Sequence, residues 1–339
     1  MRGVLVQGER KLELVQRPDP EPGPNELVVR MEASGLCGTD LHIYRGPARG
    51  SAAKVGGHEP AGVVVAAGVG VSDDWVGRSV MVHHYFGCGS CDQCLSGWTQ
   101  MCRRGNLAMG DTTDGSHSDL FTVPFSTVIE MPEGLSYLAA AAISCGAGTA
   151  WAALKRLNLT GDDTIAIFGQ GPVGLAATQF AGAMGARVIA LDLSPARLER
   201  SVKLGAWETV DPTSVESVND VVRDLTGGRG VAKSLETSGA SSAAQDALHV
   251  LDLWGAACYV GLGSTLHFHL AEHLRKQMTA TASWTLSKSQ MVDCARFVLD
   301  RRISLDALFS DRWTLSQFAE AYERFDLQTS GKGVFAPNA

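Results

Sequence analysis

The sequence lacks several features that would place it in whole classes of protein. No apolar run approaches the roughly 18 residues of a membrane-spanning helix. The start, MRGVLVQGERKLEL, carries charges throughout and has no signal-peptide core. The net charge of −7 gives no reason to expect nucleic acid or an anionic membrane as a partner. We therefore expect a cytoplasmic protein that binds neither nucleic acid nor membrane.

No internal repeat or low-complexity tract divides the chain, but its composition changes along its length. A chain of 339 residues is too long for one ordinary core and suits two domains. Residues 1–148 are rich in short strands and turns, which predicts a partly open β-barrel. Residues 149–284 alternate strand and helix at βαβ length, which predicts a doubly wound parallel sheet. The last segment, 285–339, is helical and ends in a short strand.

Eight cysteines in a chain without an export signal point to a reducing compartment, where thiolates hold metals. Four of them follow the spacing C-x2-C-x2-C-x7-C, and these are Cys88, Cys91, Cys94 and Cys102. Four thiolates around Zn²⁺ make a closed, structural site. A pair of disulfides is the alternative for the same four residues. Cys258 and Cys294 are expected to be packed thiols.

A second candidate metal site lies upstream of these four cysteines. The segments GLCGTDLHIYRG and VGGHEPAG contain Cys37, Thr39, Asp40, His42, His58 and Glu59. A cysteine and a histidine, each followed by a carboxylate, suit a partly built metal site, because a ligating histidine needs a partner that fixes its tautomer. The alternative is that the histidines are ordinary hydrogen-bonded polar residues.

A glycine-rich segment, IAIFGQGPVG, ends an apolar strand and opens a helix. Its residues Gly169, Gly171, Pro172, Val173 and Gly174 fit a dinucleotide-binding turn, in which the helix N-terminus faces the pyrophosphate. The alternative is an ordinary βαβ turn.

Two residues after the next strand bear on the choice of dinucleotide. Asp192 ends RVIALD, where a carboxylate accepts ribose hydroxyls and repels a 2′-phosphate. We therefore expect NAD rather than NADP. Arg197 is expected to flank the adenosine, and the alternative is that it accommodates a phosphate.

The chain resembles the zinc-dependent medium-chain alcohol dehydrogenases of the medium-chain dehydrogenase/reductase superfamily. The resemblance rests on the order and spacing of CGTDLHIYRG, GGHEPAG, the four cysteines and the glycine fingerprint. The resemblance runs from the N-terminal strand to the closing GKGVF. It implies a GroES-like catalytic domain with a structural-zinc lobe at 88–102, a Rossmann domain that binds NAD, and a return to the catalytic domain. It also implies two Zn²⁺ ions, an alcohol or carbonyl substrate, and a homodimer or homotetramer.

The resemblance assigns a role to each residue of the upstream site. It makes Cys145, in AAISCGAGTAW, the third ligand of a catalytic zinc, although polyol-type relatives often have a glutamate there. A buried structural cysteine is the alternative. The implied roles are zinc ligation by Cys37, His58 and Cys145, proton transfer by Thr39 and His42, orientation of His58 by Asp40, and modulation of the zinc by Glu59. Solvated carboxylates are the alternative for Asp40 and Glu59, and Lys332 is expected to be a surface cation.

Three residues bear on the identity of the substrate. His84 stands where relatives have an aromatic pocket wall, His117 stands where they usually have a glycine–phenylalanine pair, and Tyr44 is expected to line the same cavity. Two imidazoles predict a polar secondary alcohol or a polyol-like substrate. The alternative is that the histidines point away and that a simple primary or aryl alcohol is the substrate.

Two other classes of protein fit the sequence less well. The zinc-free reductases of the same superfamily lack the metal ligands and the cysteine lobe. A non-catalytic NAD-binding structural or sensing protein need not keep Thr39 and His42, and both are present.

Overall fold

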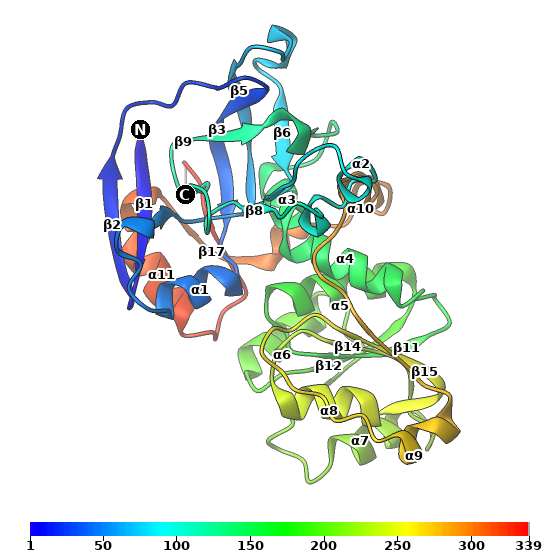
Figure 1. The fold of residues 1–339 in the computed structure, drawn as a ribbon. Helices are drawn as coiled ribbons and strands as arrows, with labels where there is room; N and C mark the ends of the chain where they lie inside the picture. Colours follow the sequence, from blue (N-terminus) through cyan, green and yellow to red (C-terminus); the bar gives the residue numbers. More distant parts are fainter. Residues whose placement is uncertain (338–339) are drawn as a thin grey trace. The chain divides into compact units, whose positions relative to one another are not determined.

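In the computed structural model, which describes residues 1–337, the chain forms two compact units (Figure 1). Unit 1 comprises Met1–Gly148, Leu286–Gln328 and the residues from Lys332 onward. Unit 2 comprises Thr149–Thr285 and the short segment Thr329–Gly331. The chain therefore passes into unit 2 at Thr149, returns to unit 1 at Leu286, and contributes three more residues to unit 2 just before its last strand.

The largest sheet of unit 1 has seven strands in the order β10-β6-β5-β3-β18-β17, with β9 paired to β3. Its strands are β3 (Glu26–Gly35), β5 (Pro60–Ala67), β6 (Ser79–Val82), β9 (Leu120–Pro124), β10 (Val128–Glu130), β17 (Phe309–Trp313) and β18 (Lys332–Phe335). Two smaller sheets contain β1 (Arg2–Gly8), β2 (Lys11–Gln16) and β4 (Lys54–Val55), and β7 (Tyr85–Phe86) and β8 (Leu107–Ala108). This is the GroES-like architecture that the resemblance implied.

Strand β3 is the centre of unit 1, because it pairs with β5, β9 and β18. Its apolar residues Leu27, Val29 and Met31 are buried in one core with side chains from β5 and β6. The last strand, β18, pairs antiparallel with the end of β3, with Phe335 opposite Ser34. This pairing brings the C-terminal part of the chain to the point where β3 ends and the first helix begins.

Helix α1 (Gly38–Arg45) follows β3, and Cys37 is its N-cap residue. Helix α3 (Tyr137–Ser144) packs against β3, β5 and β6, and ends at Cys145. The alanine-rich sequence of α3 permits this close approach, since small side chains let a helix lie near a sheet. Unit 1 also contains α2 (Asp92–Leu95), α10 (Lys288–Asp300) and α11 (Phe318–Asp326).

Helix α4 (Gly146–Arg156) follows α3 after a bend of 57° and continues from unit 1 into unit 2. Within residues 1–337 no single helix has the length and apolar composition to cross a membrane. Only α3 and α4 taken together reach that length and composition.

Unit 2 contains a six-stranded parallel sheet in the order β13-β12-β11-β14-β15-β16. Its strands are β11 (Thr164–Phe168), β12 (Arg187–Leu191), β13 (Glu208–Val210), β14 (Val231–Glu236), β15 (Leu251–Tyr259) and β16 (Thr279–Ala282). The helices between them are α5 (Pro172–Met184), α6 (Pro195–Lys203), α7 (Val218–Leu225), α8 (Ser241–His249) and α9 (Leu270–His273). In Figure 1, α5 and α8 lie on opposite sides of the sheet.

The strand order of unit 2 reverses between β11 and β14, which is where doubly wound folds bind dinucleotides. Every residue of β11 is buried, as expected for a central strand covered by helices on both faces. The glycine-rich segment leaves this strand directly at the reversal point.

Candidate functional site

Four possible metal ligands meet in unit 1, namely Cys37, His58, Glu59 and Cys145. One ligand atom of each lies within 4.8 Å of those of the other three. The ends of three elements bring them together, since Cys37 caps α1, Cys145 ends α3, and His58 and Glu59 directly precede β5. Two sulfurs, an imidazole and a carboxylate are donors that zinc accepts.

The thiols of Cys37 and Cys145 are in contact, and this contact tests whether the group suits a cation. Hydrogen bonding to the Cys145 thiol lowers the pKa of Cys37 well below its usual value, and the same contact raises the pKa of Cys145. The contact therefore favours a thiolate on Cys37 and a thiol on Cys145. A divalent cation would stabilise both as thiolates, so the residues fit the zinc that the family implies.

Asp40 holds the ring of His58 in place. Nδ1 of His58 lies 3.2 Å from one Asp40 oxygen, and the other oxygen accepts the Cys37 backbone N–H at 2.8 Å. Burial acts to raise the pKa of Asp40, but His58 and the Cys37 amide outweigh it, and the pKa falls to about 2. The ionised carboxylate accepts from Nδ1–H, which leaves Nε2 of His58 as the nitrogen that can bind a metal.

Lys332 is buried, and the expectation of a surface cation is wrong. Its ammonium group forms an ion pair with Glu59, and Nζ donates to the Leu36 carbonyl oxygen at 3.2 Å. Both members of the pair have no exposed surface. Burial acts to lower the pKa of Lys332, but Glu59 and the neighbouring Cys37 raise it overall, so the ammonium stays charged. The pairing of β18 with β3 places Lys332 here, and no local sequence pattern signals it.

Thr39 and His42 lie on α1, beyond the buried ligands. The Thr39 hydroxyl is exposed and lies 4.0 Å from the Cys37 sulfur. His42 is also exposed and stands three residues later, so it neighbours Thr39 on the helix surface. The helix therefore carries one hydroxyl beside the metal ligands and one imidazole in contact with solvent.

His84 lies beside the metal ligands. Its ring centroid is 5.1 Å from that of His58, and its Nδ1–H donates to the Ser144 carbonyl oxygen at 2.8 Å. Burial and the nearby His58 hold the pKa of His84 well below its usual value, so its imidazole is neutral. This hydrogen bond leaves Nε2 of His84 as an acceptor.

His117 and Tyr44 occupy positions that differ from the expected pocket wall. The Tyr322 hydroxyl donates to Nδ1 of His117 at 3.0 Å, and Nε2 of His117 donates to the Gly35 carbonyl oxygen at 3.4 Å. His117 has no exposed surface, so both ring nitrogens are used within the protein. Tyr44 belongs to the hydrophobic core, with its ring 5.2 Å from that of Tyr322. These contacts place both side chains in the packing of unit 1.

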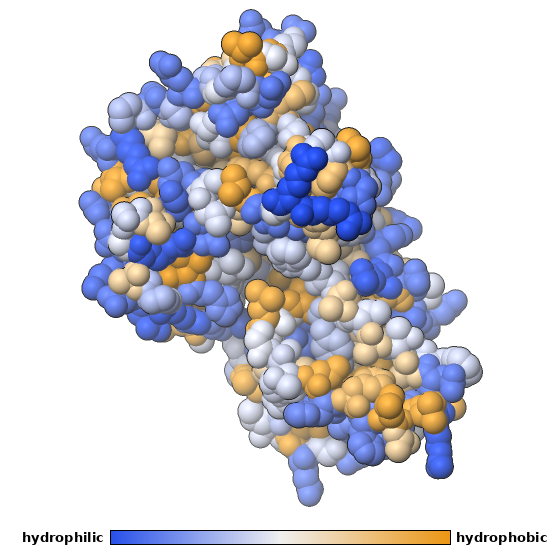
Figure 2. Space-filling view, in the orientation of Figure 1, coloured by the Kyte–Doolittle hydropathy of each residue, from blue (hydrophilic) through white to orange (hydrophobic). Residues whose placement is uncertain are grey.

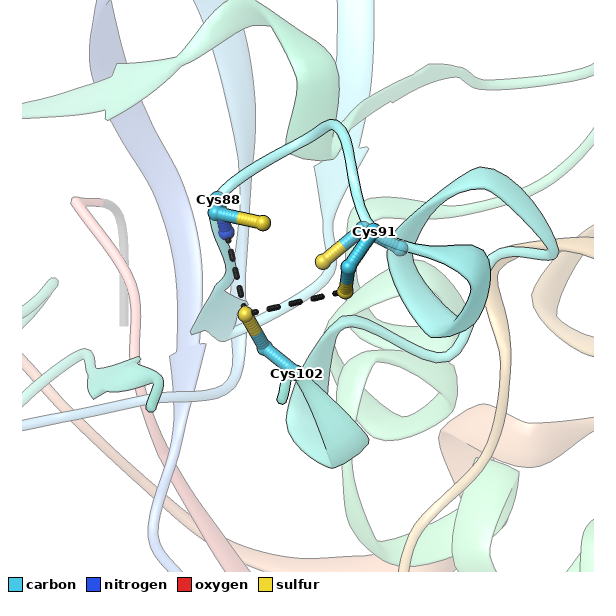
Figure 3. A group of neighbouring side chains, drawn as sticks. Cys88, Cys91 and Cys102 are labelled. Carbon is cyan, nitrogen blue, oxygen red and sulfur yellow. Dashed lines mark hydrogen bonds between the residues drawn. The ribbon is translucent and has the colours of Figure 1, made fainter. Parts of the chain in front are cut away.

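The four cysteines of the lobe also converge. Their sulfurs all lie within 4.8 Å of one another, and Figure 3 shows those of Cys88, Cys91 and Cys102 pointing toward one another. The sulfurs of Cys91 and Cys102 are 3.9 Å apart, close to the about 3.8 Å that a tetrahedron with 2.3 Å zinc–sulfur bonds requires. Hydrogen bonds from Ser90 lower the pKa of Cys88 to about 5, which favours the thiolate. These sulfurs are free thiols, so the arrangement fits a closed zinc site and not two disulfides.

Each of the three glycines in the glycine segment of unit 2 is explained by a different structural requirement. Gly169 has φ +87°, a conformation that favours glycine. A Cβ atom on Gly174 would lie 1.8 Å from the Gly169 carbonyl oxygen, so α5 packs too closely for any side chain. By contrast, a Cβ on Gly171 would have no neighbour nearer than 4.0 Å. The open backbone at Gly171, at the N-terminus of α5, can therefore receive an anionic group.

Pro172 and Val173 form the first turn of α5 and leave its N-terminus directed at this open backbone. The carboxylate of Asp192 is hydrogen-bonded to the backbone of the glycine segment. One oxygen of Asp192 accepts the Gln170 N–H at 2.5 Å, and the other accepts the Ser194 N–H at 2.8 Å. The carboxylate thus stands at the end of β12, fixed by the backbone on both sides.

Arg197, on α6, lies between Asp192 and the glycine segment. Its Nε donates to the Ser330 carbonyl oxygen at 3.1 Å, and Nη1 lies 4.0 Å from Asp192. Its Nη2 is buried without a hydrogen-bond partner within the described part of the chain. A guanidinium with an unused donor beside Gly171 fits an anionic nucleotide group and leaves both expectations for Arg197 open.

Comparisons with known proteins agree with this arrangement. The family model described as alcohol dehydrogenase GroES-like domain matches residues 23–133, and the one described as zinc-binding dehydrogenase matches residues 172–300. The zinc-type alcohol dehydrogenase-like protein YphC of Escherichia coli K12 is 32% identical over 98% of this chain and 96% of its own. The L-galactonate-5-dehydrogenase of the same strain is 30% identical, over 96% of this chain and 95% of its own.

Among solved structures, the alcohol dehydrogenase TADH from Thermus sp. ATN1 matches with a TM-score of 0.91 and 27% identity, over 99% of both chains. The acetophenone reductase from Geotrichum candidum, solved in complex with NAD, matches with a TM-score of 0.85 and 25% identity over 99% of this chain and 96% of its own.

Proposed function

Since the chain belongs to the zinc-dependent medium-chain alcohol dehydrogenases, we propose that it transfers a hydride between NAD and a polar secondary alcohol or its ketone. The observation that carries the proposal is the buried group of Cys37, His58 and Cys145 with the Thr39 hydroxyl beside it. A protein that only sensed NAD would have no use for a hydroxyl in that place.

Cys37, His58 and Cys145 would hold the catalytic zinc, with Glu59 within reach as a further ligand. When bound, zinc supplies a Lewis acid that lowers the pKa of an alcohol. Asp40 and Lys332 prepare the site, because Asp40 fixes the tautomer of His58 and Lys332 balances the charge of Glu59. The lobe cysteines would hold the second, structural zinc.

The protein's own groups provide a path for the alcohol proton. Thr39 accepts the proton, since Thr39 is exposed and its hydroxyl lies 4.0 Å from the sulfur of the ligand Cys37. His42 returns the proton to solvent, because its imidazole is exposed on the same helix as Thr39. General acid–base groups of this kind contribute about 10²–10⁴-fold to the rate.

Gly169, Gly171 and Gly174 would receive the dinucleotide pyrophosphate at the N-terminus of α5. Asp192 would accept the adenosine ribose hydroxyls, and its charge would repel a 2′-phosphate. We therefore propose NAD as the preferred dinucleotide. As an extension of the same family resemblance, we also propose a cytoplasmic homodimer or homotetramer.

Two observations support a polar substrate. The acceptor Nε2 of His84, beside the metal ligands, can bond a second hydroxyl of the substrate. One similar protein, the L-galactonate-5-dehydrogenase, is named for a polyhydroxylated acid. A site built to bond a substrate hydroxyl can reject an analogue that lacks it by about 10⁴-fold.

The test is a screen of NAD reduction over alditols, aldonates and matched secondary alkanols, with wild type and His84→Phe. We expect wild type to show a kcat/KM at least about tenfold higher for a polyhydroxylated alcohol than for the matched alkanol. His84→Phe should reduce that ratio. Wild type that prefers a long alkyl or benzylic alcohol would overturn the polar-substrate proposal, and wild type inactive on every alcohol would overturn the catalytic one.

A further inference from the structure

A third group of possible metal ligands lies in unit 2, separate from both groups described above. It consists of His249, Glu272 and His273, and one ligand atom of each lies within 4.8 Å of those of the other two. His249 is the last residue of α8, and Glu272 and His273 are the last two residues of α9. The fold therefore brings two helix ends together at one point, although 22 residues lie between His249 and Glu272.

His273 is the member of this group that most needs an explanation. Its side chain is 3% exposed, and neither ring nitrogen has a hydrogen-bond partner within residues 1–337. Buried polar groups in proteins almost always have partners, because burial removes the hydrogen bonds that water would supply. Its neighbours are rings, with Phe268 at 4.9 Å and His249 at 5.8 Å between centroids. A ligand that binds one of its nitrogens would satisfy it.

His249 is held in position by a residue outside the group. The Gln245 amide lies 3.0 Å from Nε2 of His249, and it also donates to the His267 carbonyl oxygen at 3.2 Å. In return, the His267 backbone N–H donates to Gln245 at 3.2 Å. These bonds tie α8 to the segment that leads into α9.

Charged groups of both signs lie near His273. Glu272 is exposed and supplies a carboxylate, and Lys276 is the nearby cation that opposes metal binding. Leu270 and Leu274, which flank Glu272 and His273 in the sequence, are exposed, and Figure 2 shows apolar residues over the part of unit 2 that carries α8 and α9.

We propose that His249, Glu272 and His273 form a third metal site, which binds a divalent transition-metal ion such as Zn²⁺. Two imidazoles and one carboxylate are a ligand set that Zn²⁺ accepts, with a fourth position left for water. The bound ion would link the C-terminal end of α8 to α9, and so fasten the segment between β15 and β16 to the sheet's helical layer. This site does not depend on the proposed catalytic function.

The test compares wild type with His249→Gln and Glu272→Gln, and with His269→Gln as the matched control. His269 is an exposed histidine on the same segment, and it lies outside the group. Each purified protein, with its own zinc retained, is titrated with Co²⁺ by equilibrium dialysis, and its melting temperature is measured with and without Co²⁺. Any exchange at the cysteine sites affects all four proteins alike.

We expect wild type and His269→Gln to bind one more Co²⁺ per chain than the other two variants, and to melt at a higher temperature with the ion present. His249→Gln and Glu272→Gln should bind that ion at least tenfold more weakly. Equal binding by all four proteins would overturn the proposal. Loss of the ion in His269→Gln as large as in His249→Gln would also overturn it, because it would show binding to loose surface imidazoles.

Discussion

The ion pair of Lys332 and Glu59 is buried next to the candidate zinc ligands. Replacing Lys332 by methionine would leave the Glu59 carboxylate in the interior without its cation. Loss of one partner of a buried pair typically costs about 3–5 kcal/mol. Because burial raises the pKa of Glu59 to about 7, the orphaned group can take up a proton, and we expect the lower end of that range.

Urea unfolding of Lys332→Met, Glu59→Gln and the double variant measures this effect. The double variant should lose less stability than the sum of the single variants, since it removes the uncompensated charge. Additive losses would show that Lys332 acts by packing alone.

His117 predicts a pH dependence of stability. Burial lowers the pKa of His117 to about 4, below the roughly 6.5 of the unfolded chain. The unfolded chain therefore binds more protons between these values, so the stabilisation is complete above about pH 6.5 and is lost as the pH falls toward 4. The full effect is about 3 kcal/mol. His117→Gln lacks this component, so its urea midpoint should fall less than that of wild type between pH 7 and pH 4.5. A parallel fall in both proteins would contradict this account of His117.

At the scale of elements, β11, α5 and β12 together form the proposed dinucleotide site. Asp192 ends β12 and is bonded to the backbone of the glycine segment, so it has both a structural and a selective role. Asp192→Asn keeps an acceptor oxygen and removes the charge. We expect the NAD-to-NADP ratio of kcat/KM to fall at least tenfold, which is about 1.4 kcal/mol. If wild type uses NADP as efficiently as NAD, Arg197 accommodates the 2′-phosphate and Asp192 does not exclude it.

The motifs that could be predicted from local sequence alone are those whose residues lie within one turn or loop, whereas the grouping of Cys37, His58 and Cys145 was predicted only through the family resemblance. The glycine segment and the four lobe cysteines are of this kind, because local geometry alone brings their members together. Lys332 could not be predicted to be buried, since its position depends on the pairing of β18 with β3. His249 and His273 likewise meet only because α8 and α9 end at the same point.

The direction in which a side chain points also could not be predicted from the sequence. His84 and His117 were both expected to line the substrate pocket, yet His84 lies against His58 and His117 is bonded to Tyr322. Neither residue belongs to a regular strand, where alternation would predict which way a side chain faces. Only the packing of unit 1 determines that the two side chains make these different contacts.

At the scale of the whole molecule, each unit carries one half of the proposed chemistry. Unit 1 holds the metal ligands, Thr39 and His42, and unit 2 holds the glycine segment and Asp192. The family comparisons span both units, since the two matching models cover residues 23–133 and 172–300. The central claim is therefore that the group at Cys37 is a zinc site on which oxidation of the alcohol depends.

The most direct test measures zinc content and NAD-dependent turnover together in wild type and Cys37→Ser. Both proteins are first dialysed against a weak chelator that removes loosely held ions. We expect wild type to keep two zinc ions per chain and its activity, and Cys37→Ser to fold, keep the lobe's zinc and lose turnover. Active wild type with one zinc or none, or Cys37→Ser with two zinc ions and full turnover, would contradict the account.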